Sequence, residues 1–162
     1  MPLPALSSNS DKDARGRVLV AGGSAAVPGA VLLAGVAALR SGAGKLQLAT
    51  VRESAVGLGL AVPEALIVAL PPTRAGEIAG SRALPALRPH ATRADAVLLG
   101  PGMAPNRAHH ELVGALVRLL RNDATLVLDA GALIALRGHE QILIPLGGRA
   151  VLTPHALSLI HI

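Results

Sequence analysis

The sequence predicts an α/β fold in which helices flank a mostly parallel sheet. Short apolar runs alternate with longer segments of helical pattern, and glycine-rich or polar turns separate them. Strands that alternate with helices are typical of parallel sheets, because each return to the sheet needs a crossover connection. The 162 residues suit one domain, and 51% of them are hydrophobic, which is enough to build a core.

The first strand and the first helix have the clearest pattern. Residues 17–21 (RVLVA) form an apolar run that indicates a buried strand, and Gly22-Gly23-Ser24 closes it. Pro28 stands where the first turn of a helix can begin, so we expect a helix over residues 29–41. This segment is apolar on nearly every side, which predicts a buried helix.

The rest of the chain repeats this alternation. Strands are predicted at residues 45–51, 65–70, 95–99, 125–129 and 149–153, and helices at residues 106–121 and 130–137. Asn106 is the expected N-cap of the longer helix. No helix is expected within residues 72–92, because Pro85 and Pro89 would interrupt it.

The composition excludes several kinds of site. Without cysteine, the chain can hold neither a disulfide nor a thiolate-bound metal, and no histidine spacing typical of zinc occurs, so we predict no metal site. Without Phe, Tyr and Trp, it offers no ring on which nucleic-acid bases could stack. The arginines are spread singly, so we interpret the net charge of +5 mainly as solvated surface, with a weakly anion-attracting surface as the alternative. We expect no nucleic-acid partner.

The sequence also gives no signal for export or for a membrane. Residues 1–15 lack the apolar segment of a signal peptide and are interpreted as a flexible arm. No apolar stretch reaches the ~18 residues of a membrane span. We therefore expect a cytoplasmic protein without a membrane partner.

Four motifs follow predicted strands, at the sheet edge where ligands of parallel α/β proteins bind. They are Gly22-Gly23-Ser24, Gly100-Pro101-Gly102, Asp129-Ala130-Gly131 and Thr153-Pro154-His155. The two glycine motifs could admit a ligand close to the backbone or could form ordinary turns. Asp129 could hold a ribose hydroxyl or a metal-bound water, or could cap the next helix. His155 could donate to a phosphate or a nicotinamide group, or could serve only in packing.

Taken in order, several segments resemble the opening of the ADP-dependent NAD(P)H-hydrate dehydratases, a family of the ribokinase-like superfamily. The similar segments are residues 16–24 (GRVLVAGGS), 28–30 (PGA), 32–34 (LLA), 38–46 (ALRSGAGKL), 99–103 (LGPGM), 127–133 (VLDAGAL) and 152–155 (LTPH). The resemblance covers residues 9–155 and implies a ribokinase-like α/β fold that is incomplete at its C-terminal end.

The resemblance implies a lyase that repairs hydrated nicotinamide cofactors. Members of the family use ADP to convert the ring hydroxyl of hydrated NADH or NADPH (NADHX or NADPHX) into a phosphate leaving group. Elimination then restores NADH or NADPH and releases AMP and phosphate. By the resemblance, Ala30, Gly102 and His155 contact the hydrated cofactor, and Mg²⁺ accompanies the nucleotide. Small-molecule nucleotides are then the partners, and a homo-oligomer of the full-length protein is left open.

The chain departs from the family after His155. Family members continue with Pro-Gly-Glu and a helix, and later with a glycine-rich turn ending in Gly-Asp, which cradles the transferred phosphate and supplies the catalytic base. Residues 156–162 (ALSLIHI) match neither, so the resemblance gives no catalytic residue in this chain. We expect a partial domain at 16–155, a tail at 156–162 that does not continue the native fold, and an inactive N-terminal portion of the enzyme. The alternatives are a ribokinase-like small-molecule kinase and a non-catalytic binding module.

Overall fold

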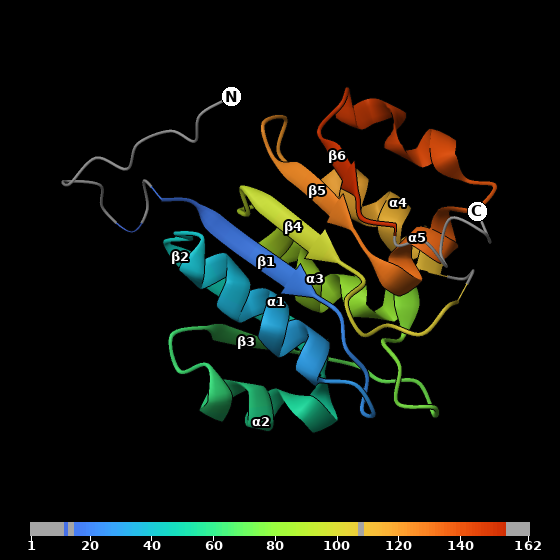
Figure 1. Ribbon diagram of the computed structural model, residues 1–162. Helices are drawn as coiled ribbons and strands as arrows, with labels where there is room; N and C mark the ends of the chain where they lie inside the picture. Colours follow the sequence, from blue (N-terminus) through green and yellow to red (C-terminus); the bar gives the residue numbers. More distant parts are fainter. Residues whose placement is uncertain (1–11, 13–14, 107–108, 155–162) are drawn as a thin grey trace.

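The computed structural model describes residues 12, 15–106 and 109–154, and it contains one six-stranded sheet (Figure 1). The strands are β1 (Arg17–Ala21), β2 (Lys45–Val51), β3 (Leu66–Leu70), β4 (Ala96–Leu99), β5 (Thr125–Leu128) and β6 (Ala150–Leu152). Their order is β3-β2-β1-β4-β5-β6, and every neighbouring pair is parallel. The predicted parallel α/β sheet is confirmed, and each strand lies within a residue or two of its predicted bounds.

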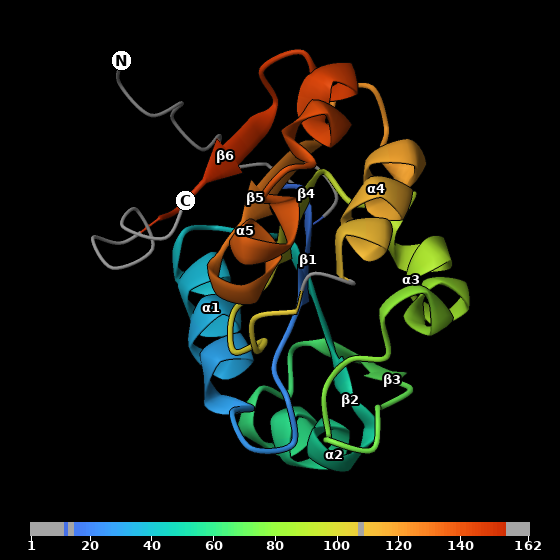
Figure 2. The same ribbon diagram turned by 90° about the vertical axis from the view of Figure 1, so that its right-hand side faces the viewer.

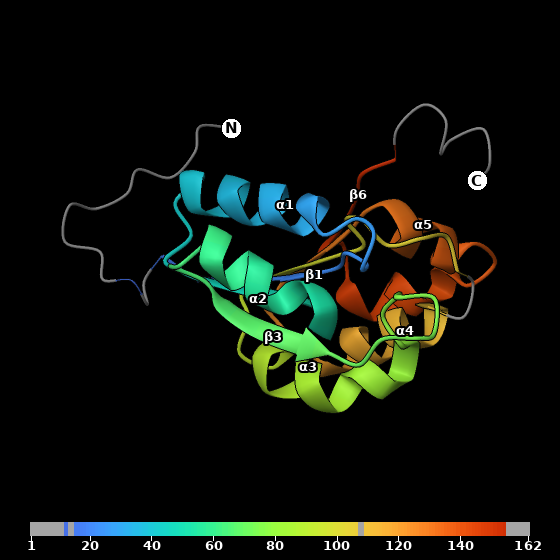
Figure 3. The same ribbon diagram turned by 90° about the horizontal axis from the view of Figure 1, so that it is seen from below.

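Helices cover both faces of this sheet. They are α1 (Gly29–Arg40), α2 (Arg52–Ala61), α3 (Leu84–Ala91), α4 (His110–Leu119) and α5 (Ala130–Leu136), with the 3₁₀ helices η1 (Gly80–Ala83) and η3 (Glu140–Leu146). Figure 2 shows α1 on one side of the sheet and α3 and α4 on the other, and Figure 3 shows α2 on the side of α1. None of the helices in the described part of the chain is long and apolar enough to cross a membrane.

The core lies in two layers, one on each side of the sheet. Alternate residues of β1 show the division, because Leu19 packs into the cluster shared with α3, α4 and α5, and Val20 packs into the cluster shared with α1 and α2. Both side chains are fully buried. Aliphatic side chains and alanine make up nearly all of this core, as a chain without aromatic residues requires. Burial of their apolar surface is the main force that holds the helices on the sheet.

Helix α1 is less buried than its apolar sequence predicts, and that expectation was wrong. It buries only Val31 and Gly35, while Leu33 is 73% exposed. A helix at the outside of a sheet covers its neighbour with one stripe only, so the apolar residues on its other faces stay in solvent.

Two helices, α2 and α3, were not predicted from the sequence. Helix α3 forms in spite of its prolines. Pro85 lies in the first turn, where an N–H would have no intrahelical partner. Pro89 lies inside the helix, which Leu87 and Ala91 bury against the core. Helix α2 follows β2 directly and was not predicted at all.

The predicted start of α4 was also wrong. The helix begins at His110 instead of Asn106. Asn106 instead begins a turn, in which its carbonyl oxygen accepts the His109 N–H at 3.1 Å. Most of the predicted N-terminal arm and all of the predicted tail, residues 156–162, lie outside the described residues.

Candidate functional site

The order of the strands sets the gap between β1 and β4 apart from the other positions in the sheet, because the direction in which strands are added reverses there. From β1 the chain moves outward through β2 to β3, and then returns to the other side of β1 to form β4, β5 and β6. The loops after β1 and β4 therefore leave the sheet towards opposite faces. Ligands of open α/β sheets bind at the carboxyl ends of the strands at such a switch point. The glycine motifs at 22–24 and 100–102 are those two loops.

The two loops pack against each other through their backbones. The Gly23 N–H donates to the Pro101 carbonyl oxygen at 2.6 Å, and a Cβ placed on Gly22 would collide with the same oxygen. Only glycine leaves room for this approach. The packing of the two loops is thus reason enough for glycine at these positions, which favours the turn interpretation for Gly22.

Gly102 and Ala30 are brought together across this junction. Gly102 has a φ of +70°, and a Cβ there would lie 2.6 Å from the Val27 carbonyl oxygen and 3.0 Å from the Ala30 Cβ. Ala30 lies in the first turn of α1, and both residues are half-buried. Two of the three residues expected to contact a cofactor are therefore neighbours at the switch point. The third, His155, lies outside the described residues.

Asp129 lies at the same edge of the sheet, directly after β5, as its position in the sequence predicts. Its N–H donates to the Leu99 carbonyl oxygen at 3.0 Å, and its Oδ1 accepts the Thr153 hydroxyl at 2.8 Å. It occupies the N-cap position of α5, but its side chain makes no capping hydrogen bond. The next residue, Ala130, has a φ of +42°, which is the left-handed region that a non-glycine residue rarely adopts. The carboxylate is thus held by Thr153, directly after β6, and not by the helix that follows Asp129.

The loop after β3 completes the rim, although no pattern in its residues predicts this. The Gly76 carbonyl oxygen accepts the Ala25 N–H at 2.9 Å, and Glu77 Oε2 accepts the Ala104 N–H at 3.2 Å. This loop therefore contacts both loops of the switch point. As a charged residue in a loop, Glu77 could have been considered for a role in the site. Its position in the sequence does not indicate which other loops it contacts.

Two buried polar side chains also escaped the sequence analysis. His109 is 1% exposed; its Nε2 lies 3.4 Å from the Ile78 carbonyl oxygen, and its Nδ1 has no hydrogen-bond partner among the described residues. Burial lowers the pKa of His109, against smaller opposing effects of the Ile78 carbonyl and Glu77. Thr50 is fully buried at the end of β2, and its hydroxyl also lacks a partner in the described structure.

A cavity of about 400 Å³ opens beside the first turn of α1. Residues from the loop after β1 and from both helices on that face line it, among them Ala25, Pro28, Leu32, Ser54 and Leu58. Most of this lining is apolar, with Glu53 as the charged residue. Within residues 12, 15–106 and 109–154, no group of three or more His, Asp or Glu side chains gathers in a way that could hold a metal ion. The backbone groups and small residues of this edge suit an organic ligand, whereas its separate carboxylates would need further ligands, such as phosphate oxygens or water, to hold a metal.

Comparison with known proteins gives one family description and several similar sequences. A family model described as NAD(P)H-hydrate dehydratase matches residues 18–158. An ADP-dependent (S)-NAD(P)H-hydrate dehydratase of Xanthomonas campestris pv. campestris is 52% identical over 158 residues, which are 96% of this chain and 50% of that protein. The chain thus spans about half the length of this curated relative.

Solved structures show the same arrangement. A ribokinase-like superfamily protein of Enterococcus faecalis V583 superposes with a TM-score of 0.75 over 95% of this chain and 50% of its own, at 22% identity, which supports the fold alone. An ADP/ATP-dependent NAD(P)H-hydrate dehydratase of Bacillus subtilis, co-crystallized with ATP and Mg²⁺, reaches a TM-score of 0.60 at 30% identity, over 81% of this chain and 43% of its own. The expected ribokinase-like fold is confirmed.

Proposed function

This chain belongs to the NAD(P)H-hydrate dehydratase family, and on that premise we propose that it contributes the cofactor-binding edge for ADP-dependent dehydration of hydrated NADH and NADPH. The observation that carries the proposal is the contact of Ala30 with Gly102 at the switch point of the sheet. The small size of these two residues lets the loop after β4 pack against the first turn of α1, so that the half-buried Ala30 and Gly102 form one part of the carboxyl edge, where we propose that the cofactor ring lies. The family membership supplies the identity of that ring.

In the proposed reaction, ADP transfers its terminal phosphoryl group to the ring hydroxyl of the hydrated cofactor. AMP leaves, and loss of the new phosphate group with a ring proton restores the double bond of NADH or NADPH. In this scheme, the role of the described residues is to bind and orient the hydrated cofactor. The N-terminal N–H groups of α1 favour an anion beside Ala30, because the first turn of a helix presents unpaired donors and the positive end of its dipole. His155 is proposed to donate to a polar group of the cofactor.

Mg²⁺ would accompany ADP and neutralise the charge of its phosphates. This ion usually keeps several waters and takes one or two carboxylates together with the phosphates of its nucleotide. Asp129 fits that requirement, because its carboxylate lies at the carboxyl edge and is already oriented by Thr153. We therefore assign Asp129, and no cluster of protein ligands, to the metal–nucleotide complex.

We expect residues 1–162 alone to show no turnover. The glycine-rich turn ending in Gly-Asp, which carries the base in the family, has no counterpart among these residues. Loss of a single group that stabilises transition-state charge costs roughly 10²–10³ in rate, and here both the phosphate cradle and the base would be missing. The assay is recovery of NADH absorbance from its hydrate with ADP and Mg²⁺, and turnover near that of a full-length relative would contradict the expectation.

Binding of the hydrated cofactor tests the proposed site itself. We expect Ala30→Val to weaken binding of hydrated NADPH to the purified chain at least about tenfold, because the added methyl groups enter the space between α1 and Gly102. Ala37→Val is the matched control, since Ala37 is exposed on the same helix two turns away. Thermal unfolding of both variants is the control for folding. Equal binding by both variants would remove Ala30 from the site.

A further inference from the structure

The fold gathers basic residues at the amino edge of the sheet, the edge opposite to the candidate site. Arg17 and Lys45 begin β1 and β2, and Arg93 and Arg121 lie in the segments that lead into β4 and β5. In the sequence these four side chains are spread over more than a hundred positions. The parallel pairing brings them to one edge, because the starts of all strands of a parallel sheet lie together.

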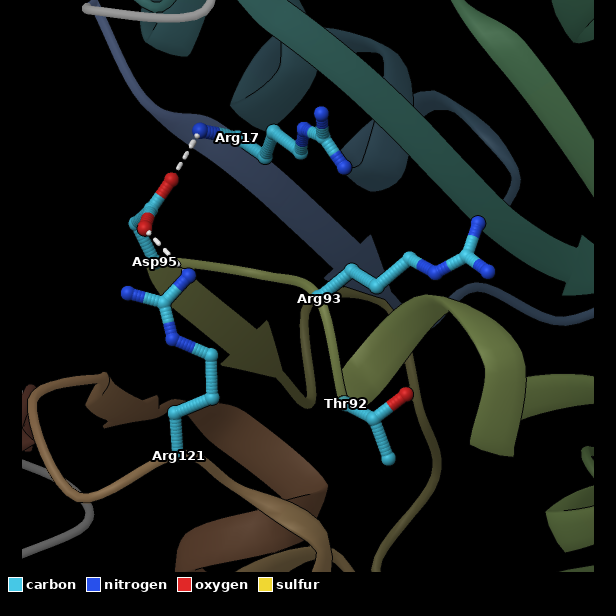
Figure 4. A pocket seen from close by; sticks show the side chains of 5 residues that line it. All are labelled: Arg17, Thr92, Arg93, Asp95 and Arg121. Carbon is cyan, nitrogen blue, oxygen red and sulfur yellow. Dashed lines mark hydrogen bonds and ion pairs between the residues drawn. The ribbon is translucent and has the colours of Figure 1, made fainter.

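Two cavities at this edge share the side chains of Arg17 and Arg93. One, of about 320 Å³, is lined by Arg17, Thr92, Arg93, Asp95 and Arg121 (Figure 4). The other, of about 290 Å³, is lined by the same two arginines with Lys45, Gln47, Leu66, Pro89 and His90. Together the two linings carry four side chains with a permanent positive charge and one carboxylate.

That carboxylate is already engaged. Asp95 Oδ2 accepts the Arg17 backbone N–H at 2.6 Å, and Asp95 Oδ1 pairs with Arg121 Nη1 at 3.0 Å. Figure 4 shows the Asp95 side chain between these two residues, while the Arg93 side chain extends away from it. Among the described residues, no carboxylate pairs with Arg93. Arg121 also pairs with both carboxylate oxygens of Asp123, so Asp95 and Asp123 together compensate its charge, and neither of them pairs with Arg93.

The histidine beside Arg93 responds to this uncompensated charge. Burial lowers the pKa of His90, and the positive charge of Arg93 lowers it further. A carboxylate close to both groups would act in the opposite direction. Part of the basic character of this edge is explained by helix ends, since Arg88 and His90 lie in the last turn of α3, where cations are favourable.

We propose that these two adjoining cavities form a second binding site, for a small phosphate-bearing anion, at the amino edge of the sheet. Guanidinium groups match the oxygens of a phosphate with two donors at a time, and Arg93 has its donors available at the boundary of the two cavities. Leu66, Pro89 and the Gln47 amide offer a mixed wall for the remainder of the molecule. The site is separated from Ala30 and Gly102 by the length of β1, roughly 13 Å of strand, so it is independent of the proposed cofactor site.

The test is titration of pyrophosphate into the purified chain by isothermal calorimetry at low ionic strength. We expect Arg93→Gln to weaken binding about tenfold or more, since hydrogen bonds to charged groups contribute that much to affinity. Arg82→Gln removes the same charge from an exposed position on η1 and should leave binding unchanged. Lys45→Gln is a second variant of the site, in case Arg93→Gln fails to fold. The imidazole resonances of His90 should shift on binding.

Three results would overturn the proposal. The first is absence of binding at millimolar pyrophosphate, and the second is equal affinity of the wild-type chain, Arg93→Gln and Lys45→Gln. The third is binding that Ala30→Val abolishes and Arg93→Gln does not, because the anion would then lie at the carboxyl edge. Since the cofactor experiment uses Ala30 and this one uses Arg93, failure of either proposal leaves the other intact.

Discussion

Replacement of Gly102 by alanine should destabilise the protein strongly, and the same replacement at Gly57 should stabilise it. At Gly102 the new Cβ would lie 2.6 Å from the Val27 carbonyl oxygen, and the backbone has a φ of +70°. The left-handed conformation costs alanine about 1–2 kcal/mol, and forcing two packed backbones apart costs about 1–3 kcal/mol more. We therefore expect Gly102→Ala to lower the free energy of unfolding by about 2–5 kcal/mol.

Gly57 provides the control because neither its backbone conformation nor its surroundings oppose a Cβ. It is exposed in the middle of α2, and a Cβ there would meet nothing within 4 Å. Alanine is favoured over glycine in a helix interior by about 0.5–1 kcal/mol, so Gly57→Ala should raise the free energy of unfolding by that amount.

Urea unfolding followed by far-ultraviolet circular dichroism measures both changes. The chain has no Trp or Tyr, so the helix signal replaces fluorescence. A Gly102→Ala variant within 0.5 kcal/mol of the unmodified chain, on the order of an ordinary surface substitution, would refute the contact between the loops after β1 and β4.

Two further predictions concern polar residues of the site. The pKa of His109 is lowered by burial in the folded chain, so between that value and its ordinary value near 6.5 the unfolded chain binds more protons, and stability should fall as the pH drops below about 6.5. His109→Leu should reduce this slope in urea unfolding at pH 5 to 8, and an unchanged slope would show that His109 is not its source. Thr153→Val removes hydroxyl hydrogen bonds to Asp129 Oδ1 (2.8 Å) and the Leu128 carbonyl oxygen (3.2 Å), so it should cost about 0.5–1.5 kcal/mol by the same assay. A variant as stable as the parent would mean that water replaces Thr153 without loss.

The strands could be predicted because each has a local sequence pattern, a short apolar run between turn residues. Strands β1 and β4 lie between other strands and are covered on at least part of both faces, so they appear as short unbroken apolar runs bounded by glycine or polar residues. Helix α2 gave no such signal, since Gly57 and Gly59 lower its helix propensity and Val56 and Leu60 place apolar residues in solvent. Helix α3 was missed because burial of Leu87 outweighs the cost of its prolines, and burial is a property of the tertiary structure.

The candidate site could be predicted only in part, for a similar reason. The resemblance identified Ala30 and Gly102 separately, but their contact depends on β1 pairing with β4, which no local pattern specifies. The same holds for the basic amino edge. The sequence analysis interpreted the arginines as solvated and dispersed, whereas the strand order brings Arg17 and Arg93 to shared cavities. Glu77 and His109 were missed because their partners, Ala104 and Ile78, lie about thirty residues away along the chain.

The most direct test of the proposed cofactor-binding edge is a map of where hydrated NADPH contacts the chain. Backbone amide resonances of an isotopically labelled sample, recorded with and without hydrated NADPH, report every residue whose surroundings change. We expect the largest shifts in residues 22–30 and 100–104, at the carboxyl ends of β1 and β4, and none at Arg17 or Lys45. Shifts confined to the amino edge, or no shifts at millimolar ligand, would contradict the assignment of this edge to the cofactor.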